Sequence, residues 1–206
     1  MCPEMITAKG PKPDRRTERT RQALMGACVA LLLSEGLEIL TVGRIVEHAN
    51  VGRSTFYTHF RGRDDILGAT MVRPSGPLAD IVDRDVGPAT LLPLLAHLLG
   101  QRRLSRVFFT GPLRRVWVNC LAGMIEPRLV SLAPRSRARP LLPLPLVALE
   151  VAEVQIGLVS HWLAGRQAAR PEAVALALIA STRAVVNALL ACGPEPTTTT
   201  RGEPSR

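Results

Sequence analysis

The feature that most constrains the fold is the spacing of the apolar residues, which repeats with the period of an α-helix. From about Thr17 one stripe follows the positions i, i+3, i+4, i+7 and i+8, and its members are Leu24, Ala27, Cys28, Leu31 and Leu32. Gly36 then supplies the left-handed residue that commonly ends a helix. Apolar residues form 47% of the chain and aromatic residues 3%, so Leu, Val and Ala must build the core. This composition favours helices over a β-sandwich.

Two short helices are predicted next, joined by a tight turn. Thr41 is a good N-cap for the first, whose apolar positions are Val42, Ile45, Val46 and Ala49. Asn50 tolerates the left-handed conformation, which favours a turn at Ala-Asn-Val-Gly. The second runs from about Arg53 to Phe60, with Phe56 and Phe60 on its inner face. A fourth helix begins near Arg63, because Asp64 and Asp65 favour a helical first turn.

Composition predicts how the chain is divided. We expect a mobile basic arm at 1–16, a first domain at 17–73, a second helical domain at 74–192 and a disordered tail at 193–206. Prolines and glycines after Arg73 predict a hinge-like connection from Pro74 to Pro88. Beyond it the expected helices are 90–108, 111–130, 145–165 and 171–191, with an irregular loop at Ala133–Pro145.

The net charge of +9 and the pI of about 10.8 fit a polyanionic partner such as nucleic acid or an acidic membrane surface. The excess is greatest at residues 100–139, which hold nine basic and one acidic side chains. A GC-rich coding bias is an equally good explanation for much of that cluster.

The four cysteines are widely spaced without a C-x-x-C pair, which argues against a zinc site or a disulfide framework. No signal peptide is recognisable, and Glu150, Glu153 and Arg183 interrupt the most apolar stretches. We therefore expect a cytoplasmic protein without a membrane span. We expect no cofactor, no metal and no enzymatic activity, since the serines lack a plausible His and Asp arrangement.

The outward face of the helix at Arg53–Phe60 is rich in hydrogen-bond donors. With both phenylalanines inside, the side chains that remain outside can all donate and none is a carboxylate: Arg53, Ser54, Thr55, Tyr57, Thr58 and His59. Such a face suits phosphate oxygens and base edges. Two short helices around a tight turn have the dimensions of a helix-turn-helix, whose second helix enters the major groove.

The segment from Thr20 to Thr70 resembles the DNA-binding domain of the TetR family of bacterial transcription regulators. The similarity lies in Thr41-Val42-x-x-Ile45 and above all in the run from Ala49 to Asp64, with its core Thr55-Phe56-Tyr57-x-His59-Phe60. It covers about a quarter of the chain. Asn50, Gly52 and Arg63 depart from the usual residues without endangering the fold, although Gly43 and Gly52 are expected to loosen the motif.

The resemblance implies an all-α protein with an N-terminal three-helix DNA-binding domain and a helical ligand-binding and dimerisation domain. It implies that Arg53, Ser54, Thr55 and Thr58 lie where relatives contact bases. Tyr57, His59 and Arg63 would approach phosphates. Thr41 would lie beside the DNA backbone, and Arg44 is a further candidate contact. The implied function is a ligand-responsive repressor that binds a palindromic operator as a dimer.

The C-terminal helices suggest two further sites. The last two helices are apolar around most of their circumference, which predicts a homodimer interface at Val154, Leu158, Trp162, Leu176, Ile179 and Val186, with a monomer core as the other explanation. A largely apolar small-molecule effector would bind within 90–165, near Phe108, Arg114 and Trp117.

Two alternatives remain open. A helical peripheral membrane or lipid-binding protein would use the 100–139 arginines on anionic headgroups, although it leaves the Thr41–Asp64 pattern unexplained. A small-molecule carrier that has lost DNA binding is the other. Vesicle binding without DNA binding would favour the first.

Overall fold

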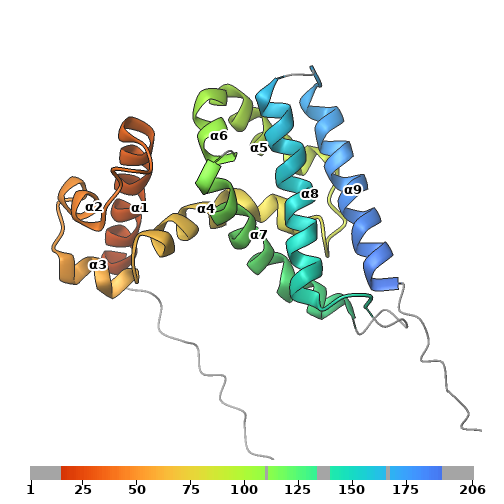
Figure 1. The fold of residues 1–206 in the computed structure, drawn as a ribbon, viewed down its shortest axis with the longest axis horizontal. Helices are drawn as coiled ribbons and strands as arrows, with labels where there is room; N and C mark the ends of the chain where they lie inside the picture. Colours follow the sequence, from red (N-terminus) through yellow and green to blue (C-terminus); the bar gives the residue numbers. More distant parts are fainter. Residues whose placement is uncertain (1–14, 110, 134–139, 166–167, 192–206) are drawn as a thin grey trace, which may run out of the picture. The chain divides into compact units, whose positions relative to one another are not determined.

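The computed structural model describes residues 15–109, 111–133, 140–165 and 168–191. The described residues are helical, as Figure 1 shows, and divide into two compact units between Thr70 and Met71. The predicted tail lies outside the described residues, as does the predicted arm except for Arg15 and Arg16, which begin the first helix.

The first unit contains α1 (Arg15–Glu35), α2 (Val42–His48), α3 (Arg53–His59) and the start of α4 (Arg63–Asp80). Gly36 ends α1 with φ 87°, in the left-handed conformation expected from the sequence. The stripe predicted on α1 is buried, and Ile45, Val46, Phe56 and Phe60 are also buried. The predicted helical periodicity of this region is confirmed.

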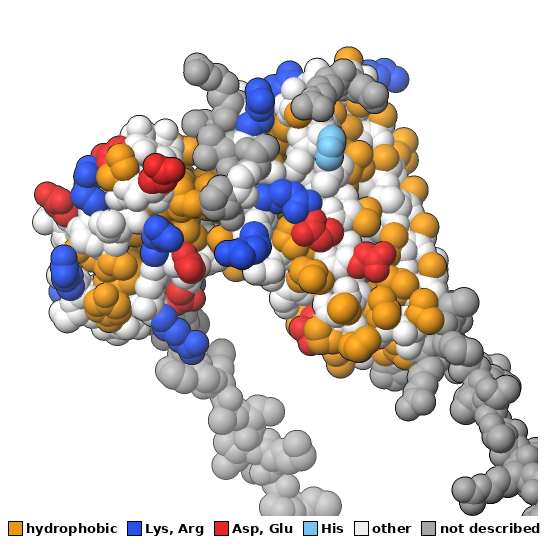
Figure 2. Space-filling view, viewed as in Figure 1, with side chains coloured by type: hydrophobic (Ala, Val, Ile, Leu, Met, Phe, Trp, Pro, Cys, Tyr) orange, Lys and Arg blue, Asp and Glu red, His pale blue; other side chains and the backbone are white. Residues whose placement is uncertain are grey.

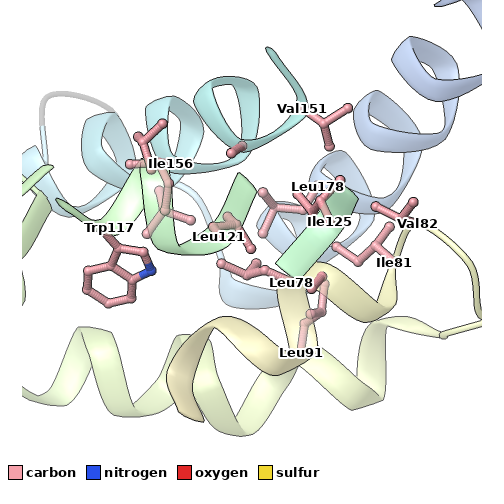
Figure 3. Close-up of a cluster of buried hydrophobic side chains, with 14 of the residues drawn as sticks. Leu78, Ile81, Val82, Leu91, Trp117, Leu121, Ile125, Val151, Ile156 and Leu178 are labelled. Carbon is pink, nitrogen blue, oxygen red and sulfur yellow. The ribbon is translucent and has the colours of Figure 1, made fainter. Parts of the chain in front are cut away.

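The second unit contains the rest of α4 with α5 (Pro88–Gly100), α6 (Arg102–Phe109), α7 (Gly111–Leu132), α8 (Leu144–Ala164) and α9 (Pro171–Ala191). Apolar side chains from several of these helices meet in one core (Figure 3). Leu78 of α4, Leu91 of α5, Leu121 of α7, Ile156 of α8 and Leu178 of α9 are all fully buried there.

The prediction of a hinge-like connection from Pro74 is wrong for its first part, because α4 continues through Pro74 and Pro77 to Asp80. Proline fits helical φ but removes the N–H that would bond the carbonyl four residues earlier. Buried Leu78 and Ala79 beyond the prolines contribute packing that offsets this loss.

The helix expected at 90–108 is in fact two helices. The chain leaves helical geometry at Gln101, where φ is −111° and ψ is 39°, directly after Gly100. Glycine is a poor helix former because it loses much backbone freedom on folding, so a break here is inexpensive.

Two described helices, Leu144–Ala164 and Pro171–Leu190, are long and apolar enough to cross a membrane by length and composition alone. By length and composition, the prediction that Glu150, Glu153 and Arg183 prevent these helices from crossing a membrane is therefore wrong. A buried helix of a globular core passes the same test, and half of the window in α8 is buried within the protein. The corresponding share for α9 is 39%, which leaves much of that apolar helix uncovered.

Candidate nucleic-acid interface

The candidate interface begins with the way α3 is anchored. Phe56 is fully buried and Phe60 is 2% exposed, with their ring centroids 5.7 Å apart. The guanidinium carbon of Arg21 on α1 lies 4.7 Å from the centre of the Phe60 ring, a cation–π contact. One side of α3 is thereby fixed against the unit, and its other side is left to solvent.

The solvent side carries the predicted donors. Arg53, Ser54, Tyr57 and Thr58 are exposed, and Tyr57 has 60% of its surface accessible. Thr55 and His59 are partly exposed. The Thr58 hydroxyl bonds the Ser54 carbonyl at 3.1 Å, so its side chain is already oriented along the helix. The face can donate hydrogen bonds to an anionic surface without a carboxylate of its own.

The geometry of α2 and of the turn sets the position of α3. The Thr41 hydroxyl accepts from the Arg44 N–H at 3.3 Å, which confirms Thr41 as the N-cap of α2. Asn50 has φ 52°, as the turn required. The Val51 N–H then bonds the Val46 carbonyl at 3.0 Å and closes the turn before α3 begins.

Arg44 and Arg63 both lie on the surface, but each has an acidic neighbour. The Arg44 guanidinium pairs with the Glu35 carboxylate, at the end of α1, at 2.6 Å. Arg63 lies 3.5 Å from Asp64, a looser and mostly exposed pair. Any anion that binds Arg44 would therefore compete with Glu35.

Three residues near this surface were not identified from the sequence. Arg21 holds the Phe60 ring, Glu35 engages Arg44, and Gly43 lies beside Arg53. A partner nine positions away, such as Glu35, gives no periodic signal in the sequence. From the sequence, Gly43 is expected only to loosen the helix-turn-helix motif.

Two of the three pocket residues proposed in the second unit, Phe108 and Trp117, lie close together. The Phe108 and Trp117 rings are 6.2 Å apart in an edge-to-face arrangement, and the Trp117 indole N–H donates to the Ser75 hydroxyl at 3.0 Å. Arg114 forms an ion pair with Glu153 of α8. Trp117 is 4% exposed, so it is a core residue in this structure.

The six residues proposed for the dimer interface divide into two groups. Trp162, Ile179 and Val186 are buried in the core of a single protomer, and the Trp162 indole donates to the Ala169 carbonyl. Val154 and Leu158 are partly buried, and Leu176 is 57% exposed. From Ala173 onward the exposed residues of α9 are instead Leu176, Asn187 and the small side chains at Ala173, Ala177, Ala180, Ala184 and Ala188.

Several arginines of the 100–139 cluster serve the fold. Arg102 donates to the Leu163 carbonyl at 2.7 Å, near the end of α8. Arg114 pairs with Glu153, and Arg128 pairs with Asp80 at 2.7 Å. These contacts weaken the lipid-binding alternative, because an arginine paired within the protein is a poorer ligand for a headgroup.

Comparison with known proteins gives a family match over the first unit. Residues 24–70 match the family described as bacterial regulatory proteins, tetR family. The regulator SrpR of Pseudomonas putida is 29% identical over 76 residues, which are 37% of this chain and 36% of SrpR. The regulator YxbF of Bacillus subtilis strain 168, itself uncharacterised, is 35% identical over 71 residues, 34% of this chain and 18% of YxbF. The matches thus span about a third or less of these relatives.

A solved structure shares the fold over most of the chain. A TetR-family regulator from Syntrophomonas wolfei superposes with a TM-score of 0.50, at 12% identity, over 82% of this chain and 95% of that one. The similarity of fold extends beyond the matched N-terminal segment.

Proposed function

We propose that this chain, which carries the DNA-binding domain of the TetR family of bacterial regulatory proteins at residues 24–70, represses transcription by binding an inverted-repeat operator as a homodimer. The observation that carries the proposal is the exposed face of α3, which offers donors from Arg53 to His59 and no carboxylate. An acidic side chain there would be repelled by phosphates. The protein would act in the cytoplasm, where the DNA is.

The position and reach of each side chain on this face decide whether it would contact bases or phosphates. Arg53 heads α3, which would be the recognition helix, and a guanidinium can bond guanine O6 and N7 together. Ser54, Thr55 and Thr58 would join it at base edges. Tyr57, which is the most exposed aromatic side chain in the described first unit, would bond a phosphate.

The remaining candidates would contact the DNA backbone. His59 and Arg63 flank the end of α3 and the start of α4, whereas Thr41 and Arg44 lie at the start of α2. Backbone contacts fix register and orientation without reading sequence. Arg44 would exchange its bond with Glu35 for one with phosphate when DNA arrives.

A second copy of the chain is the partner we propose for α8 and α9. From Ala173 to the end of α9 the one charged side chain is Arg183, which pairs with Asp85 at 3.0 Å. Figure 2 shows hydrophobic side chains scattered over the visible α8–α9 surface, with few charges. Small residues on the outward face of α9 allow two helices to approach closely. A two-fold dimer would place its recognition helices about 34 Å apart, or more, for successive major grooves.

We further propose that a largely apolar effector binds among the helices of residues 90–165 and lowers DNA affinity. Partly buried Phe108 would supply an aromatic contact, and the buried Trp117 packs edge-to-face against its ring. Arg114 would pair with a carboxylate of the effector only after release from Glu153. An effector that binds the DNA-incompetent form tenfold better supplies about 1.4 kcal/mol of coupling.

The first test is binding of the purified protein to the DNA that flanks its own gene, since a repressor of this type often controls a neighbour. Wild-type protein should retard this DNA and not a scrambled duplex of equal length. Tyr57→Phe removes one hydroxyl and should weaken binding to all duplexes similarly. Vesicle binding without retention of any duplex would contradict the proposal.

A further inference from the structure

Gly43 makes room for Arg53. Gly43 is the second residue of α2, and Arg53 is the first residue of α3. A Cβ placed on Gly43 would lie 3.2 Å from Nη2 of Arg53 and 3.8 Å from the Thr41 hydroxyl oxygen. The first distance is shorter than ordinary van der Waals contact, so a side chain here requires the guanidinium to move by a few tenths of an ångström.

The backbone does not explain a glycine at this position. The described glycines with positive φ are Gly36, Gly111 and Gly165, and Gly43 is not among them. Glycine inside a helix is less stable than alanine there, so its presence in the seven-residue α2 weakens that helix. What the missing Cβ provides is space, and Arg53 occupies it.

The neighbourhood of Gly43 differs from that of most described glycines. Gly26, inside α1, has no atom within 4 Å of an added Cβ, and Gly68 in α4 is similarly open. At Gly43 the nearest atom is a guanidinium nitrogen on the exposed face of the candidate recognition helix.

Arg53 is otherwise unconstrained. Its side chain is exposed, and the described part of the chain gives its guanidinium no hydrogen bond or ion pair. All its donors therefore remain available to DNA. The guanidinium lies next to Gly43 of α2 and has no bonded partner among the described residues that would fix its direction.

We propose that Gly43 is a specificity-determining residue that acts through Arg53. Its bare backbone lets the guanidinium lie against the first turn of α2, and this position selects the base that Arg53 reads in each half-site. The inference rests on the proposed function. It assigns Gly43 a positioning role, because Gly43 itself need not touch DNA.

The experiment compares four proteins with the wild type: Gly43→Ala, Arg53→Ala, the double variant, and Gly26→Ala as matched control. The wild-type protein first selects its operator from a pool of random duplexes. Each protein is then titrated against this operator and against a set of its single-base variants. Both alanine-for-glycine variants should fold, because alanine favours helix, and circular dichroism checks this.

Gly43→Ala should change discrimination at one base position per half-site by roughly three- to tenfold, a part of what a bidentate arginine contact contributes. Affinity for random DNA should stay within about twofold, since phosphate contacts are unchanged. Gly26→Ala should match the wild type. In the Arg53→Ala background, Gly43→Ala should have no further effect on base preference.

Two results would overturn the inference while leaving the proposed function standing. One is a Gly43→Ala protein with wild-type base preference. The other is an altered preference that persists without the Arg53 side chain, which would show that α2 acts by another route. A wild-type protein that enriches no duplex would overturn the proposed function and this inference with it.

Discussion

The side-chain amide of Gln155 on α8 donates to the main-chain carbonyl of Leu78 near the end of α4, at 3.1 Å. The same nitrogen donates to the Thr182 hydroxyl of α9 at 2.9 Å. All three residues are fully buried. One amide therefore links the end of α4 to both helices of the proposed dimer interface, beside the buried apolar cluster that Figure 3 shows.

Replacing Gln155 with Leu should lower the free energy of unfolding by about 1 kcal/mol, because the buried Thr182 hydroxyl loses this donor. The Leu78 carbonyl keeps the Ile81 N–H as a donor, and removal of the buried Gln155 Oε1, which has no partner among the described residues, offsets part of the loss. Urea denaturation measures this. Thr182→Val removes one of the acceptors, so the double variant should lose less than the sum of the two single variants. Additive losses would show that the bond to Thr182 contributes nothing to stability.

Releasing Arg44 from Glu35 should strengthen contact with DNA phosphates. Glu35→Gln keeps the size of the side chain and removes its charge, while Arg44→Ala removes the cation. We expect the dependence of log affinity on log salt to become shallower by roughly one for Arg44→Ala, whereas Glu35→Gln should raise affinity with little change of slope, because Arg44 then binds phosphate without first leaving a carboxylate. Stability should change by less than about 1 kcal/mol, since the pair is partly exposed. Equal slopes in all three proteins would exclude Arg44 from the interface.

Leu176→Asp should separate the dimer without unfolding the protomer. Leu176 is 57% exposed on α9, so a buried carboxylate would arise in the dimer and not in the monomer. Sedimentation should show the monomer mass with unchanged helix content. Leu99→Asp, at an exposed leucine of α5, is the control and should stay dimeric. A wild-type protein that sediments as a monomer at micromolar concentration contradicts the interface.

The buried thiol of Cys28 should make the free energy of unfolding depend on pH in the alkaline range. Burial raises the pKa of its thiol from 9.0 to about 12. Below pH 9 the thiol is protonated in both states, and above it the unfolded chain loses a proton that the folded chain keeps. Stability should therefore fall from about pH 9 to 12, by about 1.4 kcal/mol per pH unit from this group.

Urea denaturation of wild type and Cys28→Ala across this range measures that contribution. The Cys28→Ala protein should have a lower free energy of unfolding than the wild type at pH 9, and this free energy should fall less steeply as the pH rises. Cys120→Ala is the comparison, since the pKa of the partly exposed Cys120 thiol is also raised by burial, against a lowering hydrogen bond from Ser75. Parallel declines for wild type and Cys28→Ala would mean that Cys28 does not contribute.

Local chemistry made much of the first unit predictable. The Thr41 cap, the left-handed Asn50 and the inward Phe56 and Phe60 each depend on residues a few positions apart. Periodicity and turn preferences act over that range, so they were visible in the sequence.

The second unit was harder because its decisive contacts join distant residues. Arg128 and Asp80, which pair at 2.7 Å, are 48 positions apart. Helices that are apolar all round, such as α8 and α9, do not reveal which side faces their own core. For that reason the sequence predicts Trp162 and Ile179 at an interface although they are core residues.

Selection from a random pool of duplexes tests the central claim most directly, because it presupposes no operator. The purified full chain is incubated with the pool near physiological salt, and bound duplexes are recovered and sequenced over several rounds. We expect enrichment of an inverted repeat with half-sites spaced by one helical turn or more, which the Arg53→Ala protein should bind with relaxed preference at one position of each half-site. Recovery of no enriched sequence by the wild-type protein, with binding equal to that of random DNA, would contradict it.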